Sequence, residues 1–158
     1  MTDVRPGPPM RIPGADAEAA WQILLARIPY ARHLGLEVRR HDSGRELHLP
    51  YREPLIGNIL LPALHGGVLG ALVEITARVA AQSADADGRR PQLLNCDIDY
   101  LRSARAQSTF ARAEMIRLGR RSGLVRVICR QDDPRRPIAV GRVQLLFPGA
   151  AGPTRGPR

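Results

Sequence analysis

The segment from residue 65 to residue 81 constrains the fold more than any other part of the sequence. Large apolar residues recur along it at helical spacing, and small residues fill much of the remaining circumference. These residues are Leu69, Leu72, Val73, Thr76 and Val79, and Gly70, Ala71, Ala77 and Ala80. A helix that is apolar on nearly all sides is buried on most of them. The segment therefore predicts a long central helix covered by the rest of the chain.

Strand patterns lie on both sides of this helix. Before it, residues 36–38 and 47–51 alternate around the turn residues 42–44, which predicts a hairpin. After it, strands are predicted at residues 92–101, 109–118, 124–131 and 137–147, with turns at 119–123 and 132–135. Two strands before a helix and three to four after it predict an α+β fold, in which a curved antiparallel sheet wraps around the helix.

The chain has the length of one domain, because 158 residues are enough for a single core but not for two. Apolar residues between positions 19 and 28 have helical spacing, with Asp16 placed to cap this short N-terminal helix and Pro29 to end it. Residues 1–14 and 148–158 are rich in Pro, Gly and Arg and are predicted to be disordered tails. The domain is expected to span residues 15–147.

Two observations bear on the location of the protein. No run approaches the roughly 20 apolar residues of a membrane helix, and the N-terminus lacks the apolar region of a signal peptide. We therefore expect a cytoplasmic protein without a membrane partner. Cys96 and Cys129 lie inside strand-like runs and far from any metal-ligand spacing, so they are expected to be core thiols and not a disulfide.

The positive charge is concentrated in one part of the chain. The net charge is +9, all 24 basic residues are Arg, and residues 102–142 hold 11 Arg against 3 acids. Such a segment either attracts a phosphate-bearing ligand or is a solvated surface. RNA is a weaker interpretation, because Phe and Trp, the usual stacking platforms for bases, are nearly absent. No nucleic-acid partner is expected.

The start of the central helix has the features of a reaction site. It begins with His65, Gly66 and Gly67, and the first amides of a helix have no intrahelical acceptor and lie at the positive end of its dipole. They are donors suited to an oxyanion. Glu74 is the single acid in this helix, and its apolar neighbours Val73 and Ile75 argue against a fully exposed position.

These residues resemble a known family. His-Gly-Gly followed by Asp or Glu at the ninth position after the His is the signature of hotdog-fold acyl-CoA thioesterases of the phenylacetate-degradation and 4-hydroxybenzoyl-CoA type. Here the carboxylate is Glu74, and the similarity extends more weakly over residues 34–147. The resemblance implies a hotdog fold, thioester hydrolysis, acyl-CoA or aryl-CoA as substrate, and homodimers that often pair into tetramers.

The spacing within the helix makes a further demand. Eight residues separate Gly66 from Glu74, which at about 1.5 Å per residue is roughly 12 Å along the axis. One small carbonyl group cannot touch both, so the site should form across a two-fold dimer interface. Glu74 is then the base or the nucleophile, Gly66 the oxyanion donor, and Gly67 an additional backbone contact to the substrate.

Other site residues follow less directly. His65 either caps the helix or takes part in catalysis, and Asn58, near a position where the family has Asn or Gln, is either a donor to the substrate or a turn residue. The family's Ser or Thr after the helix is replaced here, where Asn95 is the candidate substitute. Arg78 lies one turn after Glu74 and is placed to pair with it.

The resemblance also implies where coenzyme A is held. Similar enzymes contact its phosphates through basic residues after the third strand and in the following hairpin, and the matching residues are Arg102, Arg120 and Arg121. Planar guanidinium groups suit phosphate oxygens. Solvated arginines remain the alternative at these positions.

The sequence thus predicts an acyl-CoA thioesterase without a metal or a redox cofactor. A hydratase is disfavoured, because the position about fourteen residues before the helical acid is Leu60 and not His. A non-catalytic acyl-CoA-binding or regulatory protein of the same fold remains the alternative. The acyl group cannot be deduced from the apolar loop around residues 55–61, which equally suits an interface.

Overall fold

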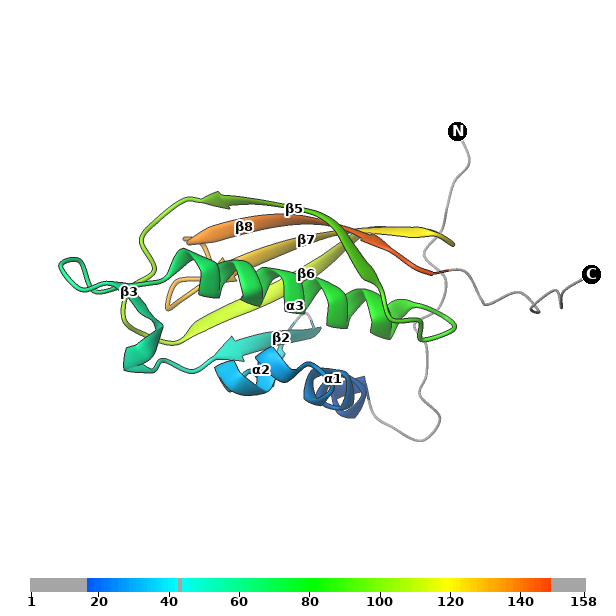
Figure 1. Cartoon of the computed structure of the whole chain (residues 1–158), viewed down its shortest axis with the longest axis horizontal. Helices are drawn as coiled ribbons and strands as arrows, with labels where there is room; N and C mark the ends of the chain where they lie inside the picture. The colour runs from blue at the N-terminus through cyan, green and yellow to red at the C-terminus, as the bar shows by residue number, and fades with distance from the viewer. Residues whose placement is uncertain (1–16, 43, 149–158) are drawn as a thin grey trace, which may run out of the picture.

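The computed structural model of the chain describes residues 17–42 and 44–148 (Figure 1). The two predicted tails, the Asp16 cap and turn residue 43 lie outside these ranges. Two short helices come first, α1 (Ala17–Ala26) and α2 (Pro29–Leu34). The first contacts the long helix α3 (Gly66–Ala84), where Trp21 Nε1 donates a hydrogen bond to Ser83 Oγ at 3.0 Å.

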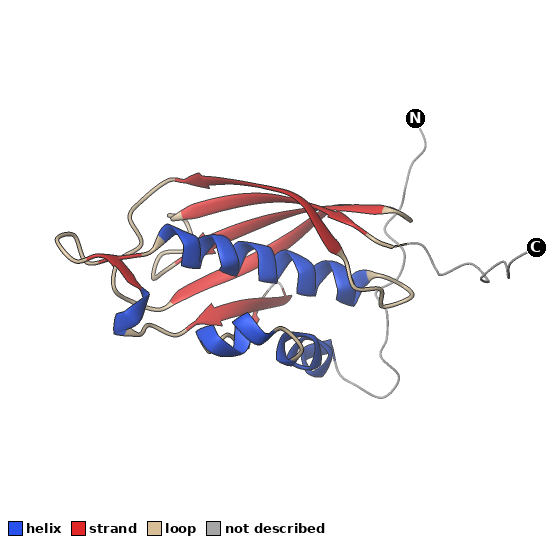
Figure 2. Cartoon of the chain, viewed as in Figure 1, coloured by secondary structure: helices blue, strands red, loops and turns tan. Residues whose placement is uncertain are grey.

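Six antiparallel strands form the main sheet, in the order β1-β2-β6-β7-β8-β5. Their bounds are β1 (Glu37–His41), β2 (Gly44–Leu49), β5 (Gln92–Tyr100), β6 (Thr109–Leu118), β7 (Ser122–Arg130) and β8 (Ala139–Leu146). A separate two-stranded hairpin, β3 (Ile56–Asn58) with β4 (Ala63–Leu64), leads into the long helix. Sheet and helices form two layers, with α3 lying along one face of the curved sheet (Figure 2).

The long helix is buried against the sheet as its composition predicts. Leu72, Val73 and Ala77 are fully buried, and α3 contacts strands β2, β5, β6, β7 and β8. The closest approach is to β8, where a Cβ built on Gly141 would lie 2.2 Å from Val73 Cγ1. Only a residue without a side chain lets the helix come this near, so Gly141 sets the depth of α3 in the sheet.

Strand β5 is an outer strand of the sheet, since it pairs with β8 alone among the described strands. Its apolar residues Leu93, Leu94 and Tyr100 are 39%, 57% and 54% exposed. Strand edges carry unpaired backbone groups that natural proteins cover or charge. Here the uncovered edge also carries apolar side chains, and it runs beside α3.

The predicted α+β fold and its strands are confirmed, with three differences. Helix α3 continues to Ala84, three residues beyond its predicted end. Pro29 does mark the end of the first helical segment, but it also begins α2, because proline fits the first helical position, where no amide donor is needed. The hairpin of β3 and β4 was not predicted, since strands of three and two residues have no measurable alternation.

Candidate active site

The start of α3 is fixed by the hairpin that precedes it. His65 N–H donates to Leu55 O at 2.9 Å, and His65 is the N-cap of α3, with its Nδ1 accepting from Gly67 N–H at 2.9 Å. A Cβ on Gly57 would lie 2.7 Å from His65 Cα, so glycine is required for this approach. The cap role predicted for His65 is therefore the one seen in the structure. Because Gly67 N–H is already bonded, Gly66 N–H is the amide of this pair that helix geometry leaves without an acceptor.

Tyr100, at the end of β5, contacts the first turn of α3. Its hydroxyl donates to Gly66 O at 2.9 Å, and a Cβ on Gly66 would lie 3.6 Å from its ring. The next inward residue of the strand, Ile98, lies 3.5 Å from a Cβ built on Gly70. Tyr100 is not among the residues predicted for the site, although the alternation of Cys96, Ile98 and Tyr100 along β5 indicates that all three share one face.

A cavity of about 420 Å³ opens beside this turn. Residues from the helix start and from the loop after β5 line it, among them Gly66, Leu69, Tyr100, Leu101, Arg102 and Ser103. The structure thus brings two predicted site residues, Gly66 and Arg102, to one cavity. Arg102 Nη1 donates to Pro137 O at 2.6 Å, which ties this loop to the start of β8.

Glu74 lies two turns along α3, with 32% of its side chain exposed. Arg78 Nη1 donates to Glu74 Oε1 at 3.1 Å, as its spacing predicts. The charge of Glu74 acts on Cys96 of β5. Burial raises the pKa of the Cys96 thiol, and the negative charges of Glu74 and Asp97 raise it further. The acid is therefore half-buried between its own helix and the uncovered edge strand, and Arg78 engages one of its two oxygens.

Two predicted donors do not reach Glu74 within one protomer. Asn58 is exposed, and its Oδ1 accepts from Leu60 N–H at 3.0 Å and Leu61 N–H at 3.2 Å, which is the arrangement of a turn residue. Asn95 is also exposed and donates to Asp97 Oδ2 at 2.7 Å. Its cross-strand partner on β8 is the exposed Gln144, so Asn95 lies on the sheet face away from α3.

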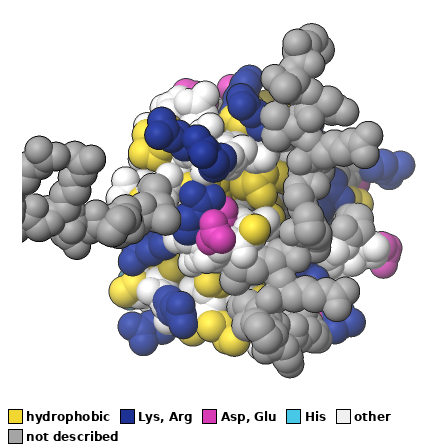
Figure 3. Space-filling model, turned by 90° about the vertical axis from the view of Figure 1, so that its right-hand side faces the viewer, with side chains coloured by type: hydrophobic (Ala, Val, Ile, Leu, Met, Phe, Trp, Pro, Cys, Tyr) yellow, Lys and Arg dark blue, Asp and Glu magenta, His cyan; other side chains and the backbone are white. Residues whose placement is uncertain are grey.

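Arg120 and Arg121 lie at the other end of the helix. They form the turn between β6 and β7. Arg89, which follows the end of α3, donates from Nη1 to Arg120 O at 3.0 Å. Figure 1 shows this turn at the opposite end of the molecule from β3, and Figure 3, which looks onto that end, shows basic side chains across it. One protomer therefore does not bring these arginines to the Gly66 cavity.

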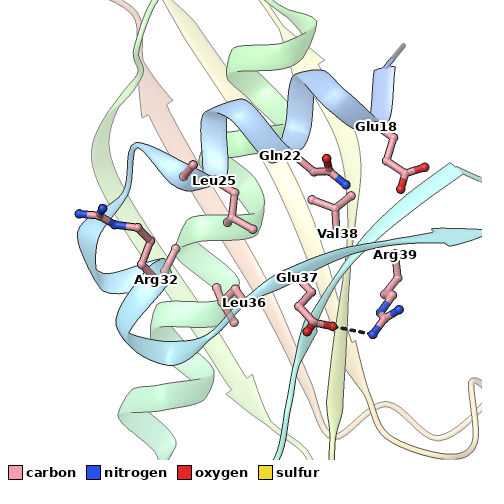
Figure 4. A pocket seen from close by; sticks show the side chains of 10 residues that line it. Glu18, Gln22, Leu25, Arg32, Leu36, Glu37, Val38 and Arg39 are labelled. Atoms are coloured by element: carbon pink, nitrogen blue, oxygen red, sulfur yellow. Dashed lines mark hydrogen bonds and ion pairs between the residues drawn. The ribbon is translucent and has the colours of Figure 1, made fainter. Parts of the chain in front are cut away.

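A second groove, of about 550 Å³, lies between α1 and the edge strand β1. Its lining includes Glu18, Gln22, Leu36, Glu37 and Arg39, with an ion pair of 2.6 Å between Arg39 Nη2 and Glu37 Oε2 (Figure 4). None of the predicted site residues lines it. The ion pair engages two of its charged groups, Glu37 and Arg39. The cavity at the start of α3 is lined by predicted site residues, and it is therefore the candidate active site.

Two negative findings apply to the residues that the structure describes. In residues 17–42 and 44–148, no group of three or more His, Cys, Asp or Glu residues is placed to hold a metal ion. Over the same ranges, every helix is too short or too polar to cross a lipid bilayer. Both cysteines are free, as predicted.

Comparison with known proteins gives a consistent result. The sequence model of the thioesterase superfamily matches residues 61–138. The medium/long-chain acyl-CoA thioesterase YigI of Salmonella typhimurium is 24% identical over 126 residues, covering 71% of this chain and 81% of its own.

Solved structures agree with this match. A thioesterase from Haemophilus influenzae superposes with a TM-score of 0.71 at 25% identity, over 84% of this chain and 90% of its own. A protein from Chromobacterium violaceum gives a TM-score of 0.66 at 28% identity, over 83% and 91%. With its antiparallel sheet wrapped around a long helix, the chain has the hotdog fold and belongs to the thioesterase superfamily.

Proposed function

We propose that this protein is an acyl-CoA thioesterase, which hydrolyses a thioester to a free acid and coenzyme A. The family and the acyl-CoA thioesterase relatives support thioester hydrolysis in general. The residues of this chain supply what the reaction requires, a carboxylate and an amide donor. In this proposal Glu74 provides the carboxylate, and Gly66 N–H stabilises the oxygen of the thioester carbonyl as it becomes negative.

The carboxylate has two possible roles. As a general base, Glu74 takes a proton from water while the water oxygen bonds to the carbonyl carbon. As a nucleophile, a Glu74 oxygen bonds to that carbon itself and forms an anhydride that water then hydrolyses. In both routes the carbon–sulfur bond breaks, and the thiolate of coenzyme A leaves and takes up a proton. Arg78 engages Oε1, so Oε2 is the oxygen proposed to act.

One observation carries the proposal of a shared site. Gly66 and Glu74 lie roughly 12 Å apart along one helix, yet Glu74 faces the side of α3 that borders the uncovered strand β5. Pairing of two β5 strands around a two-fold axis would cover this edge and set two antiparallel α3 helices side by side. Each Glu74 would then lie near Gly66 of the partner. A homodimer, and a tetramer built from two such dimers, is therefore part of the proposal.

Mixing two inactive variants tests this arrangement. Glu74→Ala removes the carboxylate, and Gly66→Pro removes the amide donor at a helix position where proline is tolerated. Each variant alone should be inactive. An equimolar mixture, refolded together, should regain about a quarter of the parent activity, because half of the dimers hold one intact site of two. A mixture no more active than its components, or an active monomer in sedimentation, would contradict a shared site.

The acyl-CoA assignment has its own support in the cavity. Arg102 lies in the loop after β5 that lines the cavity, and a guanidinium there suits a phosphate of coenzyme A. A panel of aliphatic and aromatic CoA esters, followed by release of the free thiol, would identify the acyl group. The medium/long-chain activity named for the Salmonella relative makes aliphatic esters the first to try.

A non-catalytic acyl-CoA-binding protein is the second candidate, and one contact favours it. The ion pair with Arg78 occupies one oxygen of the only acid in α3. If this pair prevents catalysis, the protein should bind CoA esters by calorimetry without releasing thiol from any of them. Turnover that depends on Glu74 would exclude this candidate.

A further inference from the structure

The peptide group between Gly66 and Gly67 is held at both of its polar atoms. Its carbonyl oxygen accepts from the Tyr100 hydroxyl at 2.9 Å, and its N–H donates to His65 Nδ1 at 2.9 Å. The two side chains come from different places, one from the residue before the helix and the other from a strand 34 residues further along the chain. Neither contact is an ion pair.

This double contact matters because both residues are glycines. Glycine has wide backbone freedom, and the first turn of a helix lacks part of its own hydrogen bonding. A peptide group is planar, so holding its oxygen and its hydrogen fixes the orientation of the whole unit. The neighbouring amide, Gly66 N–H, is linked to this plane through Gly66 Cα, and the helical conformation of Gly66 sets its direction relative to the plane.

Burial does not explain the Tyr100 contact. The side chain is 54% exposed, so its hydroxyl could bond to water at little cost. Instead the ring lies against the first turn of α3, within 3.7 Å of Cβ positions built on Gly66 and Gly70, and the hydroxyl reaches back to Gly66 O. An exposed aromatic residue at the strand end is thus ordered on the helix start.

We propose that Tyr100 is a positioning residue, which together with His65 orients the Gly66–Gly67 peptide so that Gly66 N–H, and not Gly67 N–H, faces the thioester oxygen. This inference rests on the proposed function. Tyr100 acts through the helix backbone and takes no part in bond making. Its removal should therefore lower the rate of the chemical step and leave binding of the CoA ester unchanged.

The test is Tyr100→Phe, which removes the hydroxyl and keeps the ring. Loss of one neutral hydrogen bond to the peptide should lower kcat about threefold to tenfold, with KM for the CoA ester unchanged. Tyr51→Phe is the matched control, because Tyr51 is also partly exposed, at 39%, and lies outside the candidate site. It should behave like the parent. A parental kcat in Tyr100→Phe, or a raised KM, would overturn the inference, since a raised KM assigns Tyr100 to substrate binding.

A second measurement reads the backbone without activity. In amide exchange followed by NMR, Gly67 N–H should exchange several-fold faster in Tyr100→Phe than in the parent, because its peptide plane is released on one side. Equal exchange in the two proteins would overturn the inference. If the parent protein releases no thiol from any CoA ester, the proposed function fails, and the exchange experiment still decides whether Tyr100 holds this peptide.

The pair of contacts predicts coupling between the two side chains. His65→Ala should lower kcat as well, and the double variant should lose less than the product of the two single losses, because both act on one peptide. Independent, multiplicative losses would show that they act on different groups and would overturn the joint role. Thermal unfolding of all variants should be measured alongside, so that only folded protein is counted.

Discussion

The two ends of α3 are held in different ways. At the start, neutral contacts from His65 and Tyr100 fix one peptide and leave Gly66 N–H beside a cavity. At the other end, Asp85 accepts from Arg89 at three donors, N, Nε and Nη2, at 2.8, 3.1 and 2.6 Å. Arg89 also donates to Arg120 O and lies 5.1 Å over the ring of Phe147.

This difference distinguishes an end of the helix that stabilises the fold from an end that can bind a ligand. At the end of α3, Asp85 is 4% exposed, and both of its carboxylate oxygens accept hydrogen bonds from Arg89. Such an end stabilises the fold and offers little to a ligand. The start is also held by hydrogen bonds, but its geometry leaves a donor without an acceptor beside an accessible cavity. Substitutions at the two ends should therefore affect different properties of the protein.

The largest effect is expected at Glu74, which lies on α3 closer to its start. Glu74→Gln keeps the shape and removes the charge and the basicity, so turnover of a CoA ester should fall at least about a hundredfold, the lower range for acid–base groups. Folding should survive, because the side chain is only half-buried. Glu114→Gln is the control, since Glu114 is similarly exposed and also paired with arginine. Parental turnover in a folded Glu74→Gln would remove Glu74 from the mechanism.

Arg102 should have the next largest effect on activity. Arg102→Ala removes a guanidinium from the cavity at the helix start, and losing a charged hydrogen bond costs about 1.5–3 kcal/mol, so KM for a CoA ester should rise roughly tenfold or more. The value of kcat should change little. A truncated thioester without the nucleotide is the control substrate, and its kinetics should not respond. An equal response from both substrates would place Arg102 in packing and not in phosphate binding.

Substitutions at the C-terminal end of α3, where Asp85 pairs with Arg89, should change stability and not activity. Asp85→Asn weakens the contacts to Arg89 in a nearly buried position, which should lower the free energy of unfolding by about 1–3 kcal/mol, measured in urea. Turnover per folded molecule should stay parental. A large loss of kcat in Asp85→Asn would mean that the two ends are coupled, and the comparison would fail.

The same pair gives this prediction a pH dependence. Burial acts to raise the pKa of Asp85, but the hydrogen bonds and charge of Arg89 outweigh it, so the pKa is held below its usual value of 3.8. A lowered folded-state pKa stabilises the protein above the unfolded value and loses this effect as the pH falls through the folded value. The stability difference between the parent and Asp85→Asn should therefore be constant at neutral pH and shrink below about pH 4.

Periodicity explains which parts of the fold could be predicted. The apolar pattern of α3 and the alternation of the long strands gave those elements to within a few residues. Helix α2 was missed because six residues are too few for a helical pattern and Pro29 is typical of both an end and a start. The hairpin before α3 was missed because its strands are too short to alternate.

The site residues that could be predicted are those whose partners are close in sequence. Residues close in sequence, such as the His65 cap and the Glu74–Arg78 pair, follow from helix spacing and were predicted. The Tyr100 contact joins residues 34 positions apart, and no spacing rule predicts it. The face on which Asn95 lies depends on a register shift between Leu93 and Asn95, which the sequence does not reveal.

The smallest effect on activity is expected from Arg120 and Arg121, near the C-terminal end of α3. Arg120 and Arg121 lie beyond the end of α3, and a helix of 19 residues is about 28 Å long, far more than the screening length of about 8–10 Å in physiological salt. They cannot touch a phosphate that Arg102 holds in the same protomer. Arg120→Ala and Arg121→Ala should therefore raise KM for a CoA ester less than about threefold, with no change for the truncated thioester. A tenfold rise would mean that the partner subunit brings this turn to the substrate. The phosphate contacts that the resemblance implies for Arg120 and Arg121 would then be made to the site of the other protomer.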